Sequence, residues 1–159
     1  MKKHKGFTLI ELLIVIGIIA ILAAIIYVSV DPARRLAEAR NAERWSSVNA
    51  ILNAVLKSTV DAGGVLPVTQ DNQSPTRVDI APGEVYEIGT AAAAVNCTGA
   101  TNQVDLSVLV DDYLSALPLD PSIPGTTANT GYSYSRSANG RITVSACVLE
   151  REVAISVSR

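Results

Sequence analysis

The sequence predicts an α+β protein in which a long N-terminal helix, with a membrane-spanning first half, packs against a small C-terminal antiparallel sheet. Three observations predict this fold. Residues 7–30 are almost all apolar and include one charged residue, Glu11. Residues 48–59 place apolar side chains at helical spacing. Residues 132–157 alternate apolar and polar side chains on both sides of an Asn-Gly pair, which is typical of a β-hairpin.

The apolar run is long enough to cross a membrane. Its twenty-four residues would span roughly 36 Å as a helix, at about 1.5 Å per residue, and a hydrocarbon core is about 30 Å thick. The three lysines that precede it favour a cytoplasmic N-terminus and an exported C-terminal part. An ordinary secretory signal is cut after its apolar run, here after Ala23 or Ala24, and this alternative stays open. A small residue, Gly6, lies before the run instead.

The first twelve residues resemble a known signal. A basic leader, Gly6 followed by Phe7, then Thr8-Leu9-Ile10-Glu11-Leu12 and the apolar run, is similar to the class III signal of type IV pilins and pseudopilins. The resemblance implies that a prepilin peptidase cuts the Gly6–Phe7 bond and methylates the new Phe7 nitrogen. It also implies a pilin-like lollipop built from four parts: a leader at residues 1–6, a transmembrane and assembly helix at 7–30, an amphipathic continuation at 31–62, and a globular head at 63–159.

Glu11 needs a partner inside a membrane. A carboxylate at the centre of a span costs about 2.5–3.5 kcal/mol on insertion scales. Cleavage after Gly6 would place the Phe7 amine one helical turn away, on the same face. The pair could form within one subunit, whereas the resemblance implies assembly, in which Glu11 of an incoming subunit meets the Phe7 amine of one already placed. A glutamate that is protonated or near the membrane interface is the simpler alternative. Residues 7–30 contain no proline, unlike several pilins that unwind there on assembly.

Residues 31–62 predict the second half of the long helix. Asp31-Pro32 is typical of a helix start, so the helix either restarts or kinks, and we expect a kinked continuation. Residues 33–46 carry charged side chains on most sides of the helix, so few of them are expected to pack in a core. Trp45 is expected to meet lipid, a neighbouring subunit or the head. The helix should end at Ala62-Gly63-Gly64, and its head-facing stripe is Val48, Ile51, Leu52, Val55, Leu56 and Thr59.

The middle of the chain predicts less regular structure. Short strands are expected at residues 77–80 and 85–88. Asn72 and Asn96 lie in N-x-[ST] patterns, for which chance matches are common. Apolar side chains at helical spacing predict a second helix over residues 106–117, capped by Asp105 and ended by Pro118.

Two pairs of residues in this region are candidate sites. Asp111 and Asp112 are neighbours on the predicted helix and point about 100° apart, which excludes a convergent acid–base pair. Leu117-Pro118-Leu119-Asp120-Pro121 resembles a segment of the major pseudopilins of type II secretion, where a nearby loop binds calcium. The resemblance makes Asp120 and Ser122 conceivable calcium ligands, and a turn built on two prolines is the simpler interpretation.

The last thirty residues predict three strands, at 132–136, 142–146 and 153–157, with one face covering the helix stripe. Tyr132 and Tyr134 are expected in the core or in cross-strand pairs rather than as a base-stacking platform. Cys97 and Cys147 both fall in the exported head, where an oxidising compartment favours a disulfide, and the resemblance to pilins supports it. Two separate buried thiols are the alternative.

Composition excludes several classes of function. The net charge is -2, but without the leader the chain has ten basic and fifteen acidic residues. This excess of acidic residues disfavours binding to the phosphates of nucleic acid. The single histidine, His4, lies in the leader, so a processed chain has no Ser-His-Asp or Cys-His arrangement. We therefore expect a non-enzyme without a cofactor, calcium excepted.

Three functions follow. The favoured one is a structural subunit of a type IV pilus-like filament that polymerises through its N-terminal helix. Its partners would be copies of itself, a prepilin peptidase, an assembly platform and membrane lipid. It would begin as a single-pass inner-membrane precursor with its head outside, then join an extracellular pilus or a periplasmic or cell-wall pseudopilus. The alternatives are a pseudopilin or minor pilin of a secretion or DNA-uptake machine, and a single-span anchored binding domain that does not polymerise.

Overall fold

The computed structural model describes residues 6–66, 80–90, 97–122 and 126–159. The chain divides into two compact units, residues 1–38 and 39–159, which we describe separately. The N-terminal unit holds the helix α1 (Leu9–Val30) and the start of α2 (Pro32–Asp61). The rest of α2 belongs to the second unit, the head, with the strands β1 (Val85–Ile88), β2 (Ala100–Val104), β3 (Tyr132–Arg136), β4 (Ile142–Ala146) and β5 (Ser156–Ser158) and the 3₁₀ turn η1 (Ser107–Leu109). These elements confirm the α+β class, with a long apolar N-terminal helix and a C-terminal sheet.

The helix restarts at Asp31, so the expected kinked continuation is wrong. Asp31 has left-handed backbone angles, φ 43° and ψ 82°, which interrupt the helix. Its side chain accepts a hydrogen bond from the Arg34 amide at 3.4 Å, as an N-cap does. Pro32 explains the break, because a proline disfavours the helical conformation of the preceding residue. The single helix expected from Phe7 to Ala62 is therefore two helices.

The end of α2 is confirmed. The amide of Gly64 donates to the Thr59 carbonyl at 2.8 Å, and the amide of Gly63 donates to the Val60 carbonyl at 3.1 Å. This is the Schellman pattern, which requires a residue at positive φ. Gly63 has φ 67° and adopts this conformation without the cost that a Cβ atom would add.

The head contains one five-stranded sheet in the order β2-β1-β3-β4-β5. β1 pairs with β3, β3 with β4 and β4 with β5 in antiparallel fashion, and β1 pairs with β2 in parallel. The sheet is therefore mixed rather than purely antiparallel. The strand at β1 is confirmed, whereas β2 was not predicted. Of the other expected strand, residues 77–79 lie outside the described part of the chain, and Ile80 is buried but belongs to no strand.

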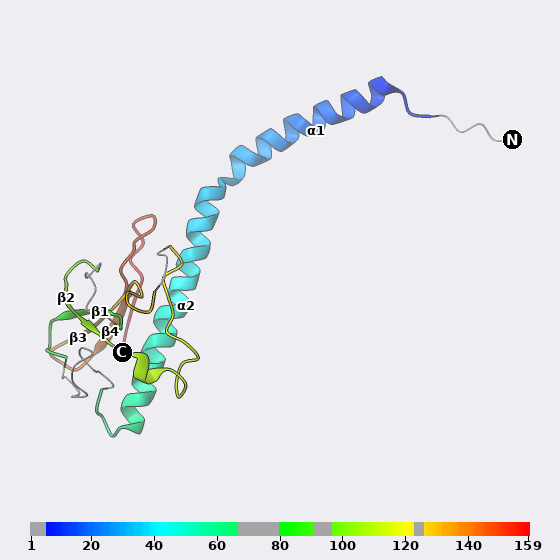
Figure 1. Ribbon diagram of the computed structural model, residues 1–159. Coiled ribbons are helices and arrows are strands. Elements are labelled where there is room, and N and C mark those ends of the chain that lie inside the picture. The colour runs from blue at the N-terminus through cyan, green and yellow to red at the C-terminus, as the bar shows by residue number, and fades with distance from the viewer. Residues whose placement is uncertain (1–5, 67–79, 91–96, 123–125) are drawn as a thin grey trace. The chain divides into compact units, whose positions relative to one another are not determined.

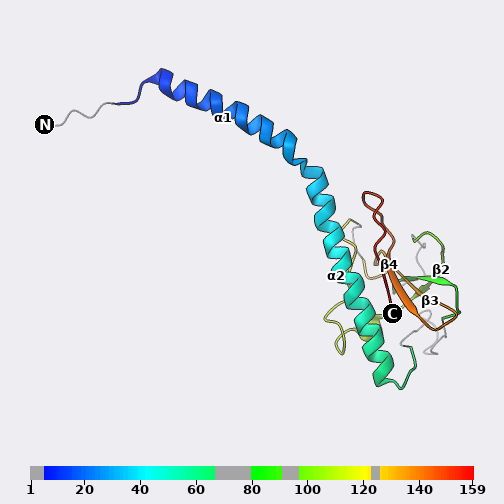
Figure 2. The same cartoon turned by 180° about the vertical axis from the view of Figure 1, so that it is seen from behind.

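One face of the sheet packs on α2, and this contact forms the core of the head (Figures 1 and 2). The predicted stripe is confirmed, because Val48, Ile51, Leu52 and Val55 are at most 1% exposed. The strands supply the opposite side of the core with Tyr86, Ile88, Val104, Tyr132, Tyr134, Ile142, Val144 and Ala146. The hairpin between β3 and β4 is also confirmed, with Gly140 at φ 80° in its turn.

The predicted second helix over residues 106–117 is wrong. Only η1 is helical. It ends at Leu109, because Val110 is extended at φ -71° and ψ 144°, and Asp111 then takes φ 77°. Asp105 does not cap a helix but accepts from the amide two residues on, at Ser107, at 2.8 Å. The apolar residues are nonetheless buried or packed on the core. The helical spacing of these residues correctly predicted that they pack on the core. Tight turns, and not a helix, bring them there.

The last strand is shorter and later than predicted. Arg151 and Glu152 both have φ 58° and form a turn closed by the Val153 amide and the Glu150 carbonyl. Pairing with β4 resumes where the Ala146 amide donates to the Ile155 carbonyl at 2.9 Å. β5 therefore starts at Ser156, and residues 153–154 belong to the connection.

Candidate functional site

The predicted processing site lies in an exposed, non-helical segment. Gly6, Phe7 and Thr8 precede α1, and the Phe7 side chain is 83% exposed. Thr8 has extended angles, φ -82° and ψ 151°, and is the N-cap of α1. A peptidase must bind a backbone that is free of helical hydrogen bonds, and the Gly6–Phe7 bond meets this requirement.

Thr8 and Glu11 form a capping box. The Glu11 carboxylate accepts from the Thr8 amide at 3.0 Å and from the Thr8 hydroxyl at 2.7 Å. In return the Glu11 amide donates to the Thr8 hydroxyl oxygen at 3.3 Å. This places the carboxylate at the first turn of α1, next to Phe7. The role of Thr8 was not predicted, although a threonine three residues before a glutamate at a helix start is the signal for such a box.

The helix that follows has no core of its own. None of the 22 residues of α1 is buried, and large apolar side chains such as Ile14, Ile18 and Leu22 are more than half exposed. Among the described residues, α1 is the one helix long and apolar enough to cross a membrane. A helix that is apolar on all sides requires lipid or other helices around it.

A second cluster of polar residues lies inside the head, around Arg44 on α2. Its side chain is fully buried. Two nitrogens of the guanidinium donate to the two carboxylate oxygens of Asp120, at 2.7 and 3.0 Å. Nη1 donates to Asn41 at 2.7 Å, and Nη2, which also serves Asp120, lies 2.8 Å from the Ser122 hydroxyl and 3.4 Å from Glu150. This is the bidentate arrangement that makes arginine–carboxylate pairs strong.

These contacts change the acidities of the cluster. Hydrogen bonding to Asp120 raises the pKa of Arg44 further, despite burial. Burial alone would raise the pKa of Asp120, but the hydrogen bonds from Arg44 and Ser122 outweigh it, and the pKa lies below its usual value. The pKa of Glu150 is also lowered, first by its hydrogen bond from Arg40. The cluster is therefore ionised at neutral pH.

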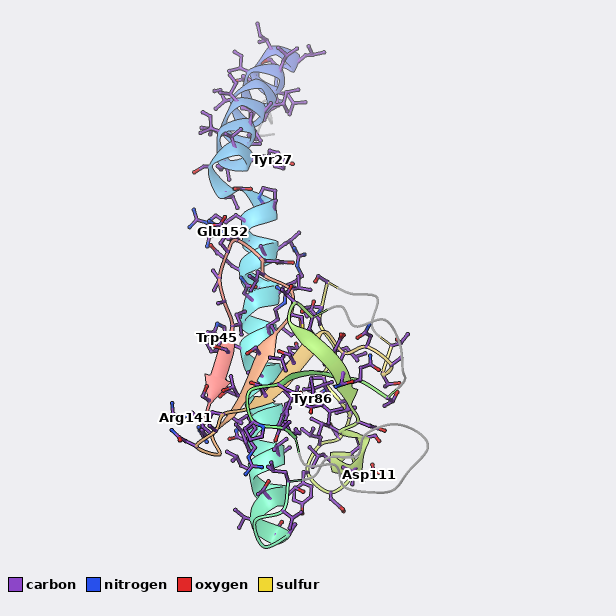
Figure 3. The ribbon with its side chains drawn as sticks, turned by 90° about the vertical axis from the view of Figure 1, so that its left-hand side faces the viewer. Tyr27, Trp45, Tyr86, Asp111, Arg141 and Glu152 are labelled. Carbon is purple, nitrogen blue, oxygen red and sulfur yellow. A yellow bond between two sulfur atoms is a disulfide. The ribbon has the colours of Figure 1, made fainter. Side chains whose placement is uncertain are left out.

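Because Asn41 and Arg44 are buried in this cluster, the expectation that few of residues 33–46 pack in the core is wrong. Arg40 of this segment donates to Glu150 at 2.7 Å, across 110 positions of the chain. The missed signal was periodicity. Asn41 and Arg44 lie seven and four residues before Val48, on the face that carries the apolar stripe. Trp45, the residue after the buried Arg44, is 41% exposed (Figure 3).

The suggested calcium ligands have other partners. Asp120 is bonded to Arg44 through both oxygens, and its Oδ1 also accepts from the Ser122 amide and hydroxyl at 2.8 and 2.6 Å. Among the described residues, no three acids, histidines or cysteines group as metal ligands would. Asp111 lies on the connection after η1 (Figure 3).

The structure joins Cys97 to Cys147, with their Cα atoms 4.8 Å apart. Cys97 precedes β2 and Cys147 follows β4, so the bond joins the segment before β2 to the segment after β4. The Cys97 amide donates to the buried carboxylate of Glu87 at 3.2 Å. The bond closes 50 residues of the head, and a loop of that length contributes roughly 4 kcal/mol in the chain-entropy model.

Tyr132 and Tyr134 are fully buried, which confirms the core interpretation and excludes a stacking platform. Burial raises the pKa of both hydroxyls. Asn72 and Asn96 lie outside the residues that the structure describes.

Comparison with known proteins identifies the N-terminal segment. Residues 1–27 match the family model of the prokaryotic N-terminal methylation motif. No solved structure matches the chain. The matched segment contains Gly6, Phe7, Thr8 and Glu11, the residues of the exposed junction and its capping box. The chain therefore carries the class III signal peptide of type IV pilins, which supports a type IV pilin-like or pseudopilin protein and points to a structural subunit rather than an enzyme.

Proposed function

We propose that the protein is a structural subunit of a type IV pilus-like filament. In this account a prepilin peptidase cuts the Gly6–Phe7 bond and methylates the Phe7 nitrogen. The processed chain waits in the inner membrane as a single-pass protein with its head outside. It then polymerises with copies of itself on a membrane assembly platform, through α1.

The observation that carries the proposal is that none of the 22 residues of α1 is buried. Lipid covers this apolar surface before assembly, and neighbouring α1 helices cover it afterwards. Because the exposed apolar side chains lie all around the helix, several neighbours can pack on one subunit at once. A plain anchor needs lipid alone, and in it Glu11 would have no role beyond the capping box with Thr8.

Glu11 supplies the polar part of the proposal. Its carboxylate contacts only Thr8 among the hydrogen bonds of the described residues. Two acceptor oxygens leave room for a further donor. The Phe7 amine of a neighbouring subunit is a cationic donor of the correct kind, and in lipid it removes the cost of an unpaired carboxylate. The pairing would also fix how far one subunit is inserted past the next.

Glu11→Gln tests this role and separates it from capping. The amide oxygen of glutamine can still accept from Thr8, whereas the negative charge is lost. We expect normal cleavage and membrane insertion, but an assembled fraction lower by roughly ten-fold or more, because a charge-assisted hydrogen bond is lost at each addition. Glu43→Gln, at an exposed position of α2, is the matched control and should assemble normally.

Normal assembly of the Glu11→Gln protein would favour the single-span anchored domain. The location of the fibre is tested separately from its formation. Abundant protein in fibres sheared from the cell surface would favour a pilus, and fibres confined to the envelope would favour the pseudopilus of a secretion or uptake machine.

A further inference from the structure

The buried cluster around Arg44 has the composition of a cation site. Oxygen atoms from three separate parts of the head converge on one point: Asn41 on α2, Asp120 and Ser122 before β3, and Glu150 between β4 and β5. Two carboxylates, a hydroxyl and an amide oxygen are the ligand types that a hard metal ion takes. Here the point is filled by the guanidinium of Arg44.

We propose that Arg44 is a built-in cation that locks two loops of the head onto α2, so that the head folds without a bound metal ion. The site is specific for a guanidinium rather than for any positive charge. Its acceptors lie where a planar fork directs its N–H groups, with Nε and Nη2 on the two oxygens of one carboxylate. A spherical ion has no such directional demand.

The lock holds each loop at more than one atom. Asp120 is fixed further by its amide, which donates to the Thr130 carbonyl at 2.9 Å. Glu150 is fixed by Arg40 through its carboxylate and by Asn41, whose side-chain amide donates to its carbonyl at 3.2 Å. Both loops therefore depend on one turn of α2, residues 40–44.

The loop that contains Glu150 is the one most in need of such a lock. The connection between β4 and β5 projects past the end of the sheet alongside α2 (Figures 1 and 2), and Glu152 lies at its tip (Figure 3). Its turn places Arg151 and Glu152, neither of them glycine, at positive φ. Such angles are unfavourable for residues with a Cβ atom and persist where surrounding contacts impose them.

Loss of Arg44 should leave an acidic, oxygen-lined cavity and release both loops. We would measure thermal unfolding of the full chain in detergent micelles through its single tryptophan, Trp45. The wild-type midpoint should be the same with calcium and with a chelator. Arg44→Ala should lower the midpoint by about 10 °C or more, because breaking a buried ion pair leaves uncompensated charge.

Chemical rescue tests the specificity of the site. Guanidinium chloride at about 20 mM is far below the molar range that unfolds proteins. It should raise the Arg44→Ala midpoint by about 2 °C or more through binding to the folded state, whereas equal potassium chloride should not. Arg35→Ala, an exposed arginine of the same helix with a side chain 70% exposed, is the matched control and should be insensitive to guanidinium.

Trypsin reports on the loop itself. Arg151 is exposed at the turn, and cleavage after it should be at least about ten-fold faster in Arg44→Ala because local opening is no longer opposed. If Arg44→Ala does not fold, Arg44→Lys replaces it. Lysine keeps the charge but not the fork, so the midpoint should still fall and cleavage should still accelerate.

Three results would overturn the proposal. A wild-type midpoint that drops in chelator would mean that a metal ion is required. Rescue by potassium chloride equal to that by guanidinium would mean screening rather than a specific site. An Arg44→Lys protein identical to wild type would mean that charge alone suffices.

Discussion

α1 and α2 follow each other directly in the chain, and they bury their side chains in opposite ways. α1 is apolar on every side and buries none of its residues in the molecule. The head portion of α2 exposes a mixture of small, polar and charged residues and buries an apolar stripe against the sheet, in which Val48, Ile51, Leu52 and Val55 are at most 1% exposed. This difference shows which contacts stabilise each helix. The head portion of α2 is stabilised within one chain, and α1 depends on lipid or on other chains.

The same contrast holds for one charge in each helix. Arg44 lies at a fully buried position and finds its counter-charges, Asp120 and Glu150, in the same chain. Glu11 lies at the start of an apolar helix, where its hydrogen-bond partner among the described residues is the uncharged Thr8. In our account the counter-charge of Glu11 comes from another subunit.

Matched truncations in the two helices should give the largest difference. Ile51 of α2 is fully buried and Ile18 of α1 is 54% exposed. Ile51→Ala should destabilise the head by about 2–5 kcal/mol through lost burial and a cavity. Ile18→Ala should leave head unfolding unchanged and weaken fibre assembly instead. Denaturant unfolding in detergent, followed at Trp45, measures the first effect, and the yield of sheared fibres measures the second. Equal unfolding midpoints for the two variants would break the contrast.

Removing the disulfide should affect the head alone. The double variant Cys97→Ser/Cys147→Ser should lose about 2–5 kcal/mol of head stability, because the unfolded chain regains the freedom of the closed loop. Helicity and membrane insertion of α1 should not change. Reduction of the wild type provides the control. It should reproduce the loss, whereas the double variant should not respond to reductant; a response there would show that the loss has another cause.

Acid should weaken the head through the Arg44 cluster. The pKa values of Asp120 and Glu150 are lowered in the folded head, so the unfolded chain binds more protons as the pH falls. Their contribution is present above the unfolded values, about 3.9 and 4.3, and is lost as the pH falls through the folded ones. The melting temperature should be level from pH 7 to 5 and fall below about pH 4.

Asp120→Asn is the matching variant. It should melt lower than wild type at pH 7 and show a shallower decline in acid, so that the two curves approach each other. A wild-type midpoint that already falls between pH 7 and 5 would contradict the assignment of the acid response to these carboxylates.

The smallest effect should come from an exposed ion pair of α2. Glu38 lies 2.9 Å from Arg34 and 3.2 Å from Arg35, and the three side chains are 41%, 56% and 70% exposed. Glu38→Ala should shift the melting temperature of the head by no more than about 2 °C, because water and salt screen such pairs. A shift as large as that of Arg44→Ala would show that burial is not what separates the two kinds of pair.

The elements that could be predicted from the sequence are those that one local pattern determines. The apolar run at α1, the stripe from Val48 to Val55, the glycines that end α2 and the β3–β4 hairpin are all specified by nearby residues. Gly6, Phe7 and Glu11 stand out because a charge and a small residue are unusual in that setting. Their roles in processing and assembly remain predictions.

The elements that could not be predicted are those whose structure depends on residues far away in the chain. Residues 106–117 have helical spacing, yet the core accepted their apolar side chains in turns, because propensity is weak against tertiary packing. β2 has little apolar character and is a strand because β1 pairs with it. Arg44 appeared to be one more surface charge, since its partners Asp120 and Glu150 are 76 and 106 residues away in sequence.

The N-terminus of the assembled protein tests the central claim most directly. Mass spectrometry of protein recovered from the cell surface would identify its first residue and its modification. The account predicts a chain that starts at Phe7 with a methylated α-amino group, so that α1 and Glu11 remain in the mature subunit. A mature chain that starts after Ala23 or Ala24 would lack most of α1 and would contradict the account.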